Sequence, residues 1–368
     1  MMIHNEDSEQ FLSLINEWYT AIRQRNLEKS INLKTNIDLS IDKFEQDLNL
    51  ILHYHLVNFR YDYLIDKFSI KAGRFDIIDR YDIHNVPSVN SPILYYYYFF
   101  KALYYNVIGN YKDSMCYYYK AESYLPALSD ELEQAEFFYM LGCVKYESFQ
   151  GTLALKEVEN AKQIFSRDSK YITNVAFCEN TLGLIYTQIK EFSLAKKHFY
   201  KALNIFGSIN EEIHILMTKQ NLALMYGEQN YSSVAIEYLS NINSTVLNNY
   251  KSLFIEARER YKLKEFDIAL ERIERGICVC QSIQNVEYLH HFYILQALVT
   301  NVPAIKLECL IYNALEYFEK EGLMEYKIEY TELLADVFYS EDNLSMACKY
   351  FKDANKIKNI VVGKVDIQ

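Results

Sequence analysis

The stretch GLIYTQIKEFSLAKKHFYKA, residues 183–202, contains a spacing of small and bulky residues that recurs along the chain. It starts with a small residue, Gly183, and has aromatic residues at +3, +9 and +16 and alanine at +12 and +19. Related units start at five further small residues: Ala102, Gly142, Ala223, Ala257 and Ala335. This pattern indicates pairs of closely packed helices, because small side chains let two helix axes approach each other.

The starting residues of successive units are separated by 40, 41, 40, 34 and 78 residues. The last interval is two units long, so a degenerate unit is expected around 285–320. We therefore predict about seven helical hairpins over residues 94–368, stacked into a superhelix because no hairpin can bury its apolar face alone. The first helices would line a concave surface, which suits recognition of an extended peptide or a partner helix better than catalysis.

The composition also predicts an all-α protein. The chain has only 10 glycines and 4 prolines and is 50% hydrophobic, which favours long helices, short turns and a sizeable core. The net charge of −11 provides no basic face of the kind that nucleic acid requires. Seven scattered cysteines without a CxxC motif are typical of a reduced, cytosolic protein. The polar start MMIHNEDSEQ is unlike a signal peptide and no apolar run has the length of a membrane span, so a cytoplasmic location is expected.

The N-terminal segment has a different pattern from the repeats. Phe11, Trp18 and Ile22 fall on one face of an amphipathic helix. Helices are predicted over three ranges: 6–25, 27–40 and about 44–70. Together they form a three-helix bundle over residues 1–75. The stretch 76–93 contains two prolines and many polar residues, which indicates a linker that lets the bundle move against the repeats.

Two N-terminal motifs resemble those of a known family. Residues 15–23, INEWYTAIR, are similar to the NEWYxxIR opening of the Rap family, which comprises response-regulator phosphatases and antagonists of spore-forming Gram-positive bacteria. Residues 50–60, LILHYHLVNFR, are similar to that family's LLLYYSLMEFRH segment. The family combines a three-helix bundle, a linker and an array of tetratricopeptide (TPR) repeats, so the resemblance covers the whole chain.

The resemblance implies a quorum-sensing function. In this family the bundle and the start of the array hold a response regulator, and members either hydrolyse its aspartyl phosphate or block its DNA-binding domain. A short signalling peptide, re-imported into the cytosol, binds in the TPR groove, after which the array compacts, the bundle moves and the regulator is released. The expected partners are a response regulator and a short peptide, with no direct nucleic-acid contact, no membrane and no cofactor. Sporulation, competence and transfer of mobile elements are the pathways that fit.

The resemblance also implies where catalytic residues would lie. The family's phosphatases have an acidic residue and a Gln before the second motif, and the Gln amide orients water towards the phosphoryl group. The acidic residue corresponds to Asp47, but the Gln corresponds to Leu48, which has no donor or acceptor. Gln46 is close by, but on a continuous helix it would face roughly 200° away. Asp47, Leu48 and Tyr54 are also the expected regulator contacts. Two alternatives follow, sequestration of the regulator or hydrolysis that uses Gln46 or another group near it.

The peptide-binding residues are likewise implied by the resemblance. The family's peptide-anchoring asparagine corresponds to Asn221, whose amide can donate and accept hydrogen bonds at once. An exposed position in the groove is expected for it. Two groove acids of some relatives correspond to Gln188 and His291, which implies a less cationic peptide. By helical phase alone, three more residues face this groove: Glu179, Asn180 and Tyr186.

The remaining histidines predict no metal site. His53 and His55 are two residues apart and would point about 200° from each other on a helix. His290 and His291 are adjacent and are no better placed. A third functional alternative is a TPR interaction protein that controls a repressor or a mobile-element regulator without catalysis.

Overall fold

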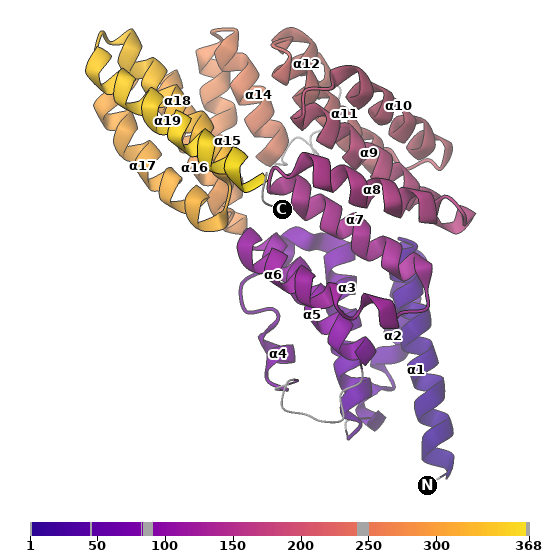
Figure 1. Cartoon of the computed structure of the whole chain (residues 1–368). Helices are drawn as coiled ribbons and strands as arrows, with labels where there is room; N and C mark the ends of the chain where they lie inside the picture. The colour runs from indigo at the N-terminus through magenta and orange to yellow at the C-terminus, as the bar shows by residue number, and fades with distance from the viewer. Residues whose placement is uncertain (1, 45, 82, 84–90, 241–249, 366–368) are drawn as a thin grey trace. The chain divides into compact units, whose positions relative to one another are not determined.

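The computed structural model describes residues 2–44, 46–81, 83, 91–240 and 250–365. Every regular element in these residues is helical, which confirms the predicted all-α fold. Figure 1 shows that helices adjacent in sequence form antiparallel pairs joined by short turns.

The three predicted N-terminal helices are present with shifted ends. They are α1 (Met2–Arg23), α2 (Leu27–Asp38) and α3 (Leu48–Asp66). Helix α3 begins at Leu48 rather than near 44, because Ile41–Phe44 forms a short 3-10 helix and the Asp47 side chain caps the helix that follows. In α1 the expected apolar face, including Phe11, Trp18 and Ile22, is buried.

The predicted linker lies partly outside the described residues. Its first part forms the short helix α4 (Asp76–Asp79). Residues 82 and 84–90 are outside the described part of the chain. The next helix, α5, begins at Ser91, three residues before the predicted start of the repeats at residue 94.

Seven helical hairpins follow in the described residues. Their helix pairs are α5 (Ser91–Val107) with α6 (Tyr111–Glu122), α7 (Glu131–Glu147) with α8 (Gly151–Phe165), α9 (Ile172–Gln188) with α10 (Phe192–Ser208), α11 (Glu212–Glu228) with α12 (Ser232–Ser240), α14 (Tyr250–Lys262) with α15 (Phe266–Ile283), α16 (Val286–Val299) with α17 (Ala304–Glu321), and α18 (Met324–Ser340) with α19 (Leu344–Val365). The pair α16 and α17 accounts for the degenerate unit expected around 285–320. The predicted number of hairpins is confirmed.

The small residues of the repeat permit close packing. Gly276 on α15 occupies the +19 position of its unit, and a Cβ atom added there would lie 2.1 Å from the ring of Phe292 on α16. Gly142 on α7 also lies close to α8, since a Cβ atom added there would lie 2.5 Å from the side chain of Val158. Larger residues at these two positions would force the helices apart.

One turn conformation joins the two helices of each described hairpin. A residue with φ between 52° and 79° follows the first helix, and the next N–H group donates to the carbonyl five residues earlier at 2.8–2.9 Å. This bond satisfies a carbonyl that the end of the helix leaves unpaired. The seven residues with this conformation are Gly109, Phe149, Lys190, Asn230, Lys264, Asn301 and Asp342.

Contacts within the chain define two compact units. Unit 1 comprises Met1–Ile185 with Tyr200–Ile209, and unit 2 comprises Tyr186–Phe199 with Asn210–Gln368. This division does not fall at the predicted linker. The predicted bundle and the first repeats therefore belong to the same unit.

Within unit 1, a buried polar network joins the bundle to the repeats. Glu136 on α7 accepts hydrogen bonds from Nε and Nη2 of Arg60 on α3, at 3.1 and 2.6 Å, and from the Tyr19 hydroxyl on α1 at 2.9 Å. Glu136, Arg60 and Tyr19 are all buried. Burial, together with Glu136 itself, raises the pKa of Tyr19, so the phenol remains a hydrogen-bond donor. Arg23, at the end of α1, forms an ion pair with Asp130 just before α7, at 2.8 Å.

Replacing Glu136 with alanine should strongly destabilise unit 1. The change leaves the Arg60 guanidinium buried without its counter-charge, which costs about 3–5 kcal/mol in comparable sites. Urea unfolding followed by circular dichroism would measure the loss. The matched control is Glu131→Ala on the same helix, because Glu131 pairs with Arg167 in solvent and should contribute less than about 1 kcal/mol. Equal effects of the two changes would contradict the assignment.

The structure also predicts that acid destabilises the protein through His53. Burial lowers the pKa of His53 to about 4, and its ring stacks on Tyr96 with centroids 5.2 Å apart. In the unfolded chain His53 takes up a proton near pH 6.5, whereas in the folded chain it does so only near pH 4. Protonation therefore favours the unfolded chain, and the free energy of unfolding falls as pH decreases through this range. The full effect is about 3 kcal/mol. Urea unfolding at pH 7, 6 and 5 should show this loss in the wild type, and His53→Phe should reduce it.

A second variant controls for general damage to α3. Phe59→Leu lowers stability without removing a titrating group, so its loss of stability between pH 7 and 5 should match that of the wild type. If His53→Phe also keeps the full pH dependence, the histidine is not its source.

Candidate functional site

The candidate phosphatase position lies at the start of α3. The Asp47 side chain accepts hydrogen bonds from the backbone N–H groups of Asn49 and Leu50, at 3.1 and 3.2 Å, and so caps the helix. Leu48 is the first residue of the helix and is half-buried. Asp47 therefore has a structural role, and Leu48 brings no polar atom to this position.

Gln46 is placed differently from the sequence expectation. It lies in the turn before α3, so the argument that helical phase turns it by roughly 200° does not apply. Its side chain is exposed. The Gln46 amide is therefore a solvent-facing group outside the helix.

Tyr54 connects two helices of the bundle. Its hydroxyl donates to Asp38 at the end of α2, at 2.9 Å. Burial and the bond to Asp38 raise the pKa of Tyr54, which keeps the hydroxyl protonated. This contact fixes α2 beside the part of α3 that carries the second motif.

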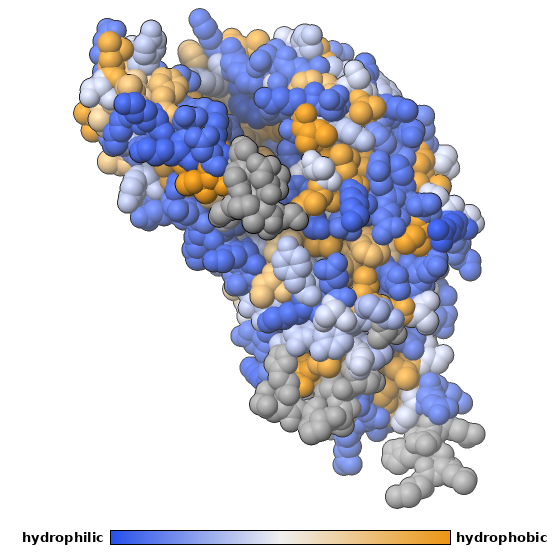
Figure 2. All heavy atoms as spheres, viewed as in Figure 1, coloured by the Kyte–Doolittle hydropathy of each residue, from blue (hydrophilic) through white to orange (hydrophobic). Residues whose placement is uncertain are grey.

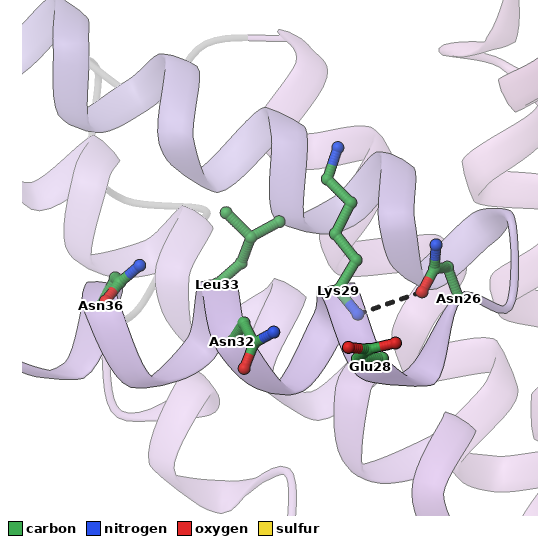
Figure 3. Close-up of a pocket in the computed structure, with 6 residues that line it drawn as sticks. All are labelled: Asn26, Glu28, Lys29, Asn32, Leu33 and Asn36. Carbon is green, nitrogen blue, oxygen red and sulfur yellow. Dashed lines mark hydrogen bonds between the residues drawn. The ribbon is translucent and has the colours of Figure 1, made fainter.

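The outer face of α2 combines amide groups with exposed apolar side chains. Figure 3 shows a surface pocket along this helix that is lined by Asn26, Glu28, Lys29, Asn32, Leu33 and Asn36. Asn26 caps the helix by accepting a hydrogen bond from the backbone of Lys29 at 3.0 Å. Leu27, Ile31 and Leu39 are also exposed on α2 or at its end. Such a mixed surface is typical of the rim and centre of a protein interface.

The predicted groove residues of unit 1 are both buried. Glu179 on α9 lies 3.4 Å from Lys162 and 3.7 Å from Lys201, with which it forms ion pairs. Asn180, the next residue, is also buried. Lysine neighbours balance the charge of Glu179 within unit 1.

The other predicted groove residues lie in unit 2. Tyr186 stacks on His198 with ring centroids 5.1 Å apart, and Gln188 is half-buried. Asn221 on α11 is only 8% exposed, whereas an exposed position was expected. Its neighbour Gln220 is also buried and accepts a hydrogen bond from the Ser252 hydroxyl at 2.6 Å. This hydrogen bond joins α11 to α14.

His291 is buried in an aromatic cluster instead of lying open to a ligand. It is 2% exposed, and its Nδ1 atom lies 2.5 Å from the Tyr330 hydroxyl. Phe254, Phe318 and Tyr326 surround the ring, with centroids between 4.5 and 5.5 Å away. In this arrangement the imidazole has a packing role.

One charged cluster of unit 2 was not anticipated from the sequence. Arg258 on α14 contacts Glu228 on α11 through Nη1 at 2.8 Å and contacts Glu259 through Nε at 3.0 Å. Lys262 also binds Glu259, at 3.0 Å. Burial acts to raise the pKa of Glu259, but Arg258, Ser232 and Lys262 together outweigh it, so the pKa is lowered. In the sequence each of these residues resembles an ordinary surface charge. Helix α14 itself brings Arg258, Glu259 and Lys262 together, and the contact with α11 adds Glu228.

The described residues contain neither a metal-binding cluster nor a membrane-spanning helix. No cluster of His, Cys, Asp and Glu side chains there could hold a metal ion. None of the helices in that part of the chain has the length and apolar character needed to cross a membrane.

Comparison with known proteins identifies relatives of the whole chain. The family model for the N-terminal part of response regulator aspartate phosphatase H matches residues 6–66. Response regulator aspartate phosphatase I of Bacillus subtilis (strain 168) is 25% identical over 349 residues, which cover 92% of this chain and 88% of that protein. Regulatory protein RapF of the same organism is 23% identical over 376 residues, covering 96% and 95%.

A solved structure shares the fold. The crystal structure of a Rap protein complexed with competence and sporulation factor matches with a TM-score of 0.83 at 20% identity, covering 97% of this chain and 99% of that one. The bundle with its two motifs, the seven hairpins and these matches together make the chain similar to Rap proteins over nearly its whole length.

Proposed function

We propose that this protein is a cytoplasmic quorum-sensing regulator that binds a response regulator and is inhibited by a short signalling peptide. The bundle over residues 1–75 would hold the regulator, the stretch 76–93 would act as the linker, and the repeats over 94–368 would bind the peptide. Relatives named as response regulator aspartate phosphatases, and a Rap structure that contains a peptide factor, support both partners.

The outer face of α2 and the start of α3 are the proposed regulator-binding surface. Leu27 and Ile31 expose apolar area beside the amides of Asn32 and Asn36, so the surface can bury carbon atoms and still pair polar groups. The Tyr54–Asp38 hydrogen bond holds α2 and α3 together as one surface.

We further propose that the protein sequesters its regulator without hydrolysing the aspartyl phosphate. The observation that carries this proposal is the start of α3, where Asp47 caps the helix and Leu48 occupies the position expected for Gln. The Leu48 side chain has no amide that could orient a water molecule there. Losing one such preorganised polar group commonly reduces a rate by about 10²–10³.

Peptide binding would act on the regulator through the packing of the bundle. In this structure the bundle is docked on α7 by Tyr19 and Arg60, which both bind Glu136. We propose that the docked arrangement is the one that peptide favours and that the regulator disfavours. A ligand shifts such an equilibrium only by its difference in affinity for the two arrangements.

The hydrolysis question can be tested with a phosphorylated response regulator that binds the purified protein. The wild type should leave the decay of the phosphoryl label at its intrinsic rate, whereas Leu48→Gln should accelerate it, by about 10²-fold if the rest of the site is intact. Leu48→Met is the matched control, because it changes shape without adding a polar group. Acceleration by the wild type that disappears in Gln46→Ala would instead establish catalysis by Gln46.

The peptide site can be tested by titrating short synthetic peptides that represent the reading frame immediately downstream. Asn221→Ala should weaken binding by about 10-fold or more, because the paired N–H and C=O groups of the peptide lose one partner. It should also lower stability slightly, because the side chain is buried. The control is Gln220→Ala, which removes the hydrogen bond to Ser252 and should lower stability without lowering the affinity for the peptide. Equal affinity of Asn221→Ala and wild type in calorimetry would refute this placement.

A further inference from the structure

The last described hairpin exposes a position that every comparable hairpin buries. The +16 residue of the repeat lies on the second helix and is 0–1% exposed in five units. These residues are Tyr118, Val158, Phe199, Leu239 and Ile273. The corresponding residue of α19, Phe351, is 43% exposed. In the earlier units this position packs in the core between hairpins, as Ile273 does in the cluster that contains Phe292 of the next helix.

The exposed position belongs to a larger apolar surface. Tyr339, Leu344, Ala347, Cys348, Phe351, Lys352 and Asn355 line a shallow hollow on α18 and α19, which we call the α19 face. Of these residues, Tyr339, Leu344 and Phe351 are large, apolar and exposed. Figure 2 shows hydrophobic patches among hydrophilic residues on the visible surface of the molecule. No helix in the described part of the chain covers the α19 face.

Repeat arrays need polar outer faces at their ends to stay soluble. The α19 face has the opposite composition, since Lys352 is the only charged residue among the seven that line it. Leu344, Cys348, Phe351 and Asn355 follow one another at intervals of 4, 3 and 4, which is the stripe that a helix presents to a partner helix. A covering helix would remove this apolar area from water.

We propose that the α19 face binds a second copy of this chain, with the two α19 helices antiparallel across a two-fold axis near Ala347 and Cys348. This arrangement places Leu344 opposite Phe351 of the second copy on both sides of the axis. Ala347 and Cys348 are small enough at the centre to let the helices approach closely. The proposal does not depend on the proposed regulator or peptide.

The charges of the face favour a second copy over an unrelated partner. Asp342 precedes α19, Lys352 follows Phe351, and neither takes part in an ion pair among the described residues. An antiparallel two-fold contact brings Asp342 of each copy near Lys352 of the other, so the surface is complementary to itself. The opposed helix directions also align the two dipoles favourably.

The association should be reversible, because the contact involves one helix face from each copy. Sedimentation velocity of the full chain over a wide concentration range should show a monomer that becomes a dimer. Phe351→Glu should raise the dimer dissociation constant by about 100-fold or more, because a carboxylate would be buried in the contact against the apolar side chain of Leu344. Tyr312→Glu is the matched control, since Tyr312 is an exposed aromatic residue on α17 that lies outside the α19 face.

A charge exchange tests the orientation. Asp342→Lys and Lys352→Asp should each weaken the dimer, by about 10-fold, because each single change creates two repulsive pairs. The double variant should restore it. The fold tolerates lysine at the turn position of Asp342, since Lys190 and Lys264 adopt the same left-handed conformation in their hairpins. Cys348, which is exposed, should cross-link to itself with a short bis-maleimide in the wild type but not in Phe351→Glu.

Several results would overturn the proposal. A monomer at every concentration would do so, as would a dimer that Phe351→Glu leaves intact. A double charge variant that dimerises no better than the single ones would refute the antiparallel pairing. If the chain stays monomeric and Phe351→Glu instead abolishes binding of the response regulator, the face belongs to that partner.

Discussion

The buried carboxylate of Glu136 is the constraint on which the arrangement of unit 1 depends. A carboxylate removed from water is costly unless charged and polar donors replace its hydration. The donors are Arg60 on α3 and the Tyr19 hydroxyl on α1, so Glu136 is satisfied only when both helices are docked on α7. Tyr19 and Arg60 lie in the two motifs that resemble the Rap family. The motifs therefore carry contacts between the bundle and the repeats, in addition to any contact with a partner.

The repeat spacing was sufficient to predict the hairpins, because it reports which side chains must be buried. Ala195, Phe199 and Ala202 are all fully buried, as the +12, +16 and +19 positions require. The turns could not be predicted in the same way. Lys190 and Phe149 have positive φ, where glycine or asparagine would be expected from local preference. Packing of the two helices imposes this conformation on whatever residue occupies the turn, so the signal lies in tertiary structure and not in residue type.

The candidate sites were less predictable, for a related reason. Helical phase shows which face of a helix a residue occupies, but it does not show whether a neighbouring helix covers that face. Asn221 and His291 both occupy plausible groove positions in the sequence, yet both are buried, and Tyr330 lies within hydrogen-bonding distance of His291. Asp47 illustrates the opposite case. Its role as a helix cap is local, and the sequence would have revealed it had the start of α3 been placed at Leu48.

The contrast between the two kinds of packing in this protein bears on how it could switch. Successive hairpins meet through apolar surfaces, as at Gly276 and Phe292. Separating them would expose apolar surface to water, which is unfavourable. The bundle meets α7 through Glu136, Arg60 and Tyr19, all of which regain hydrogen bonds to water when they separate. Opening this polar contact therefore costs less, for the same area, than opening an apolar one. Movement of the N-terminal bundle with the repeats kept intact, as proposed for peptide binding, would use this difference, because in unit 1 the polar contact lies between the bundle and the repeats.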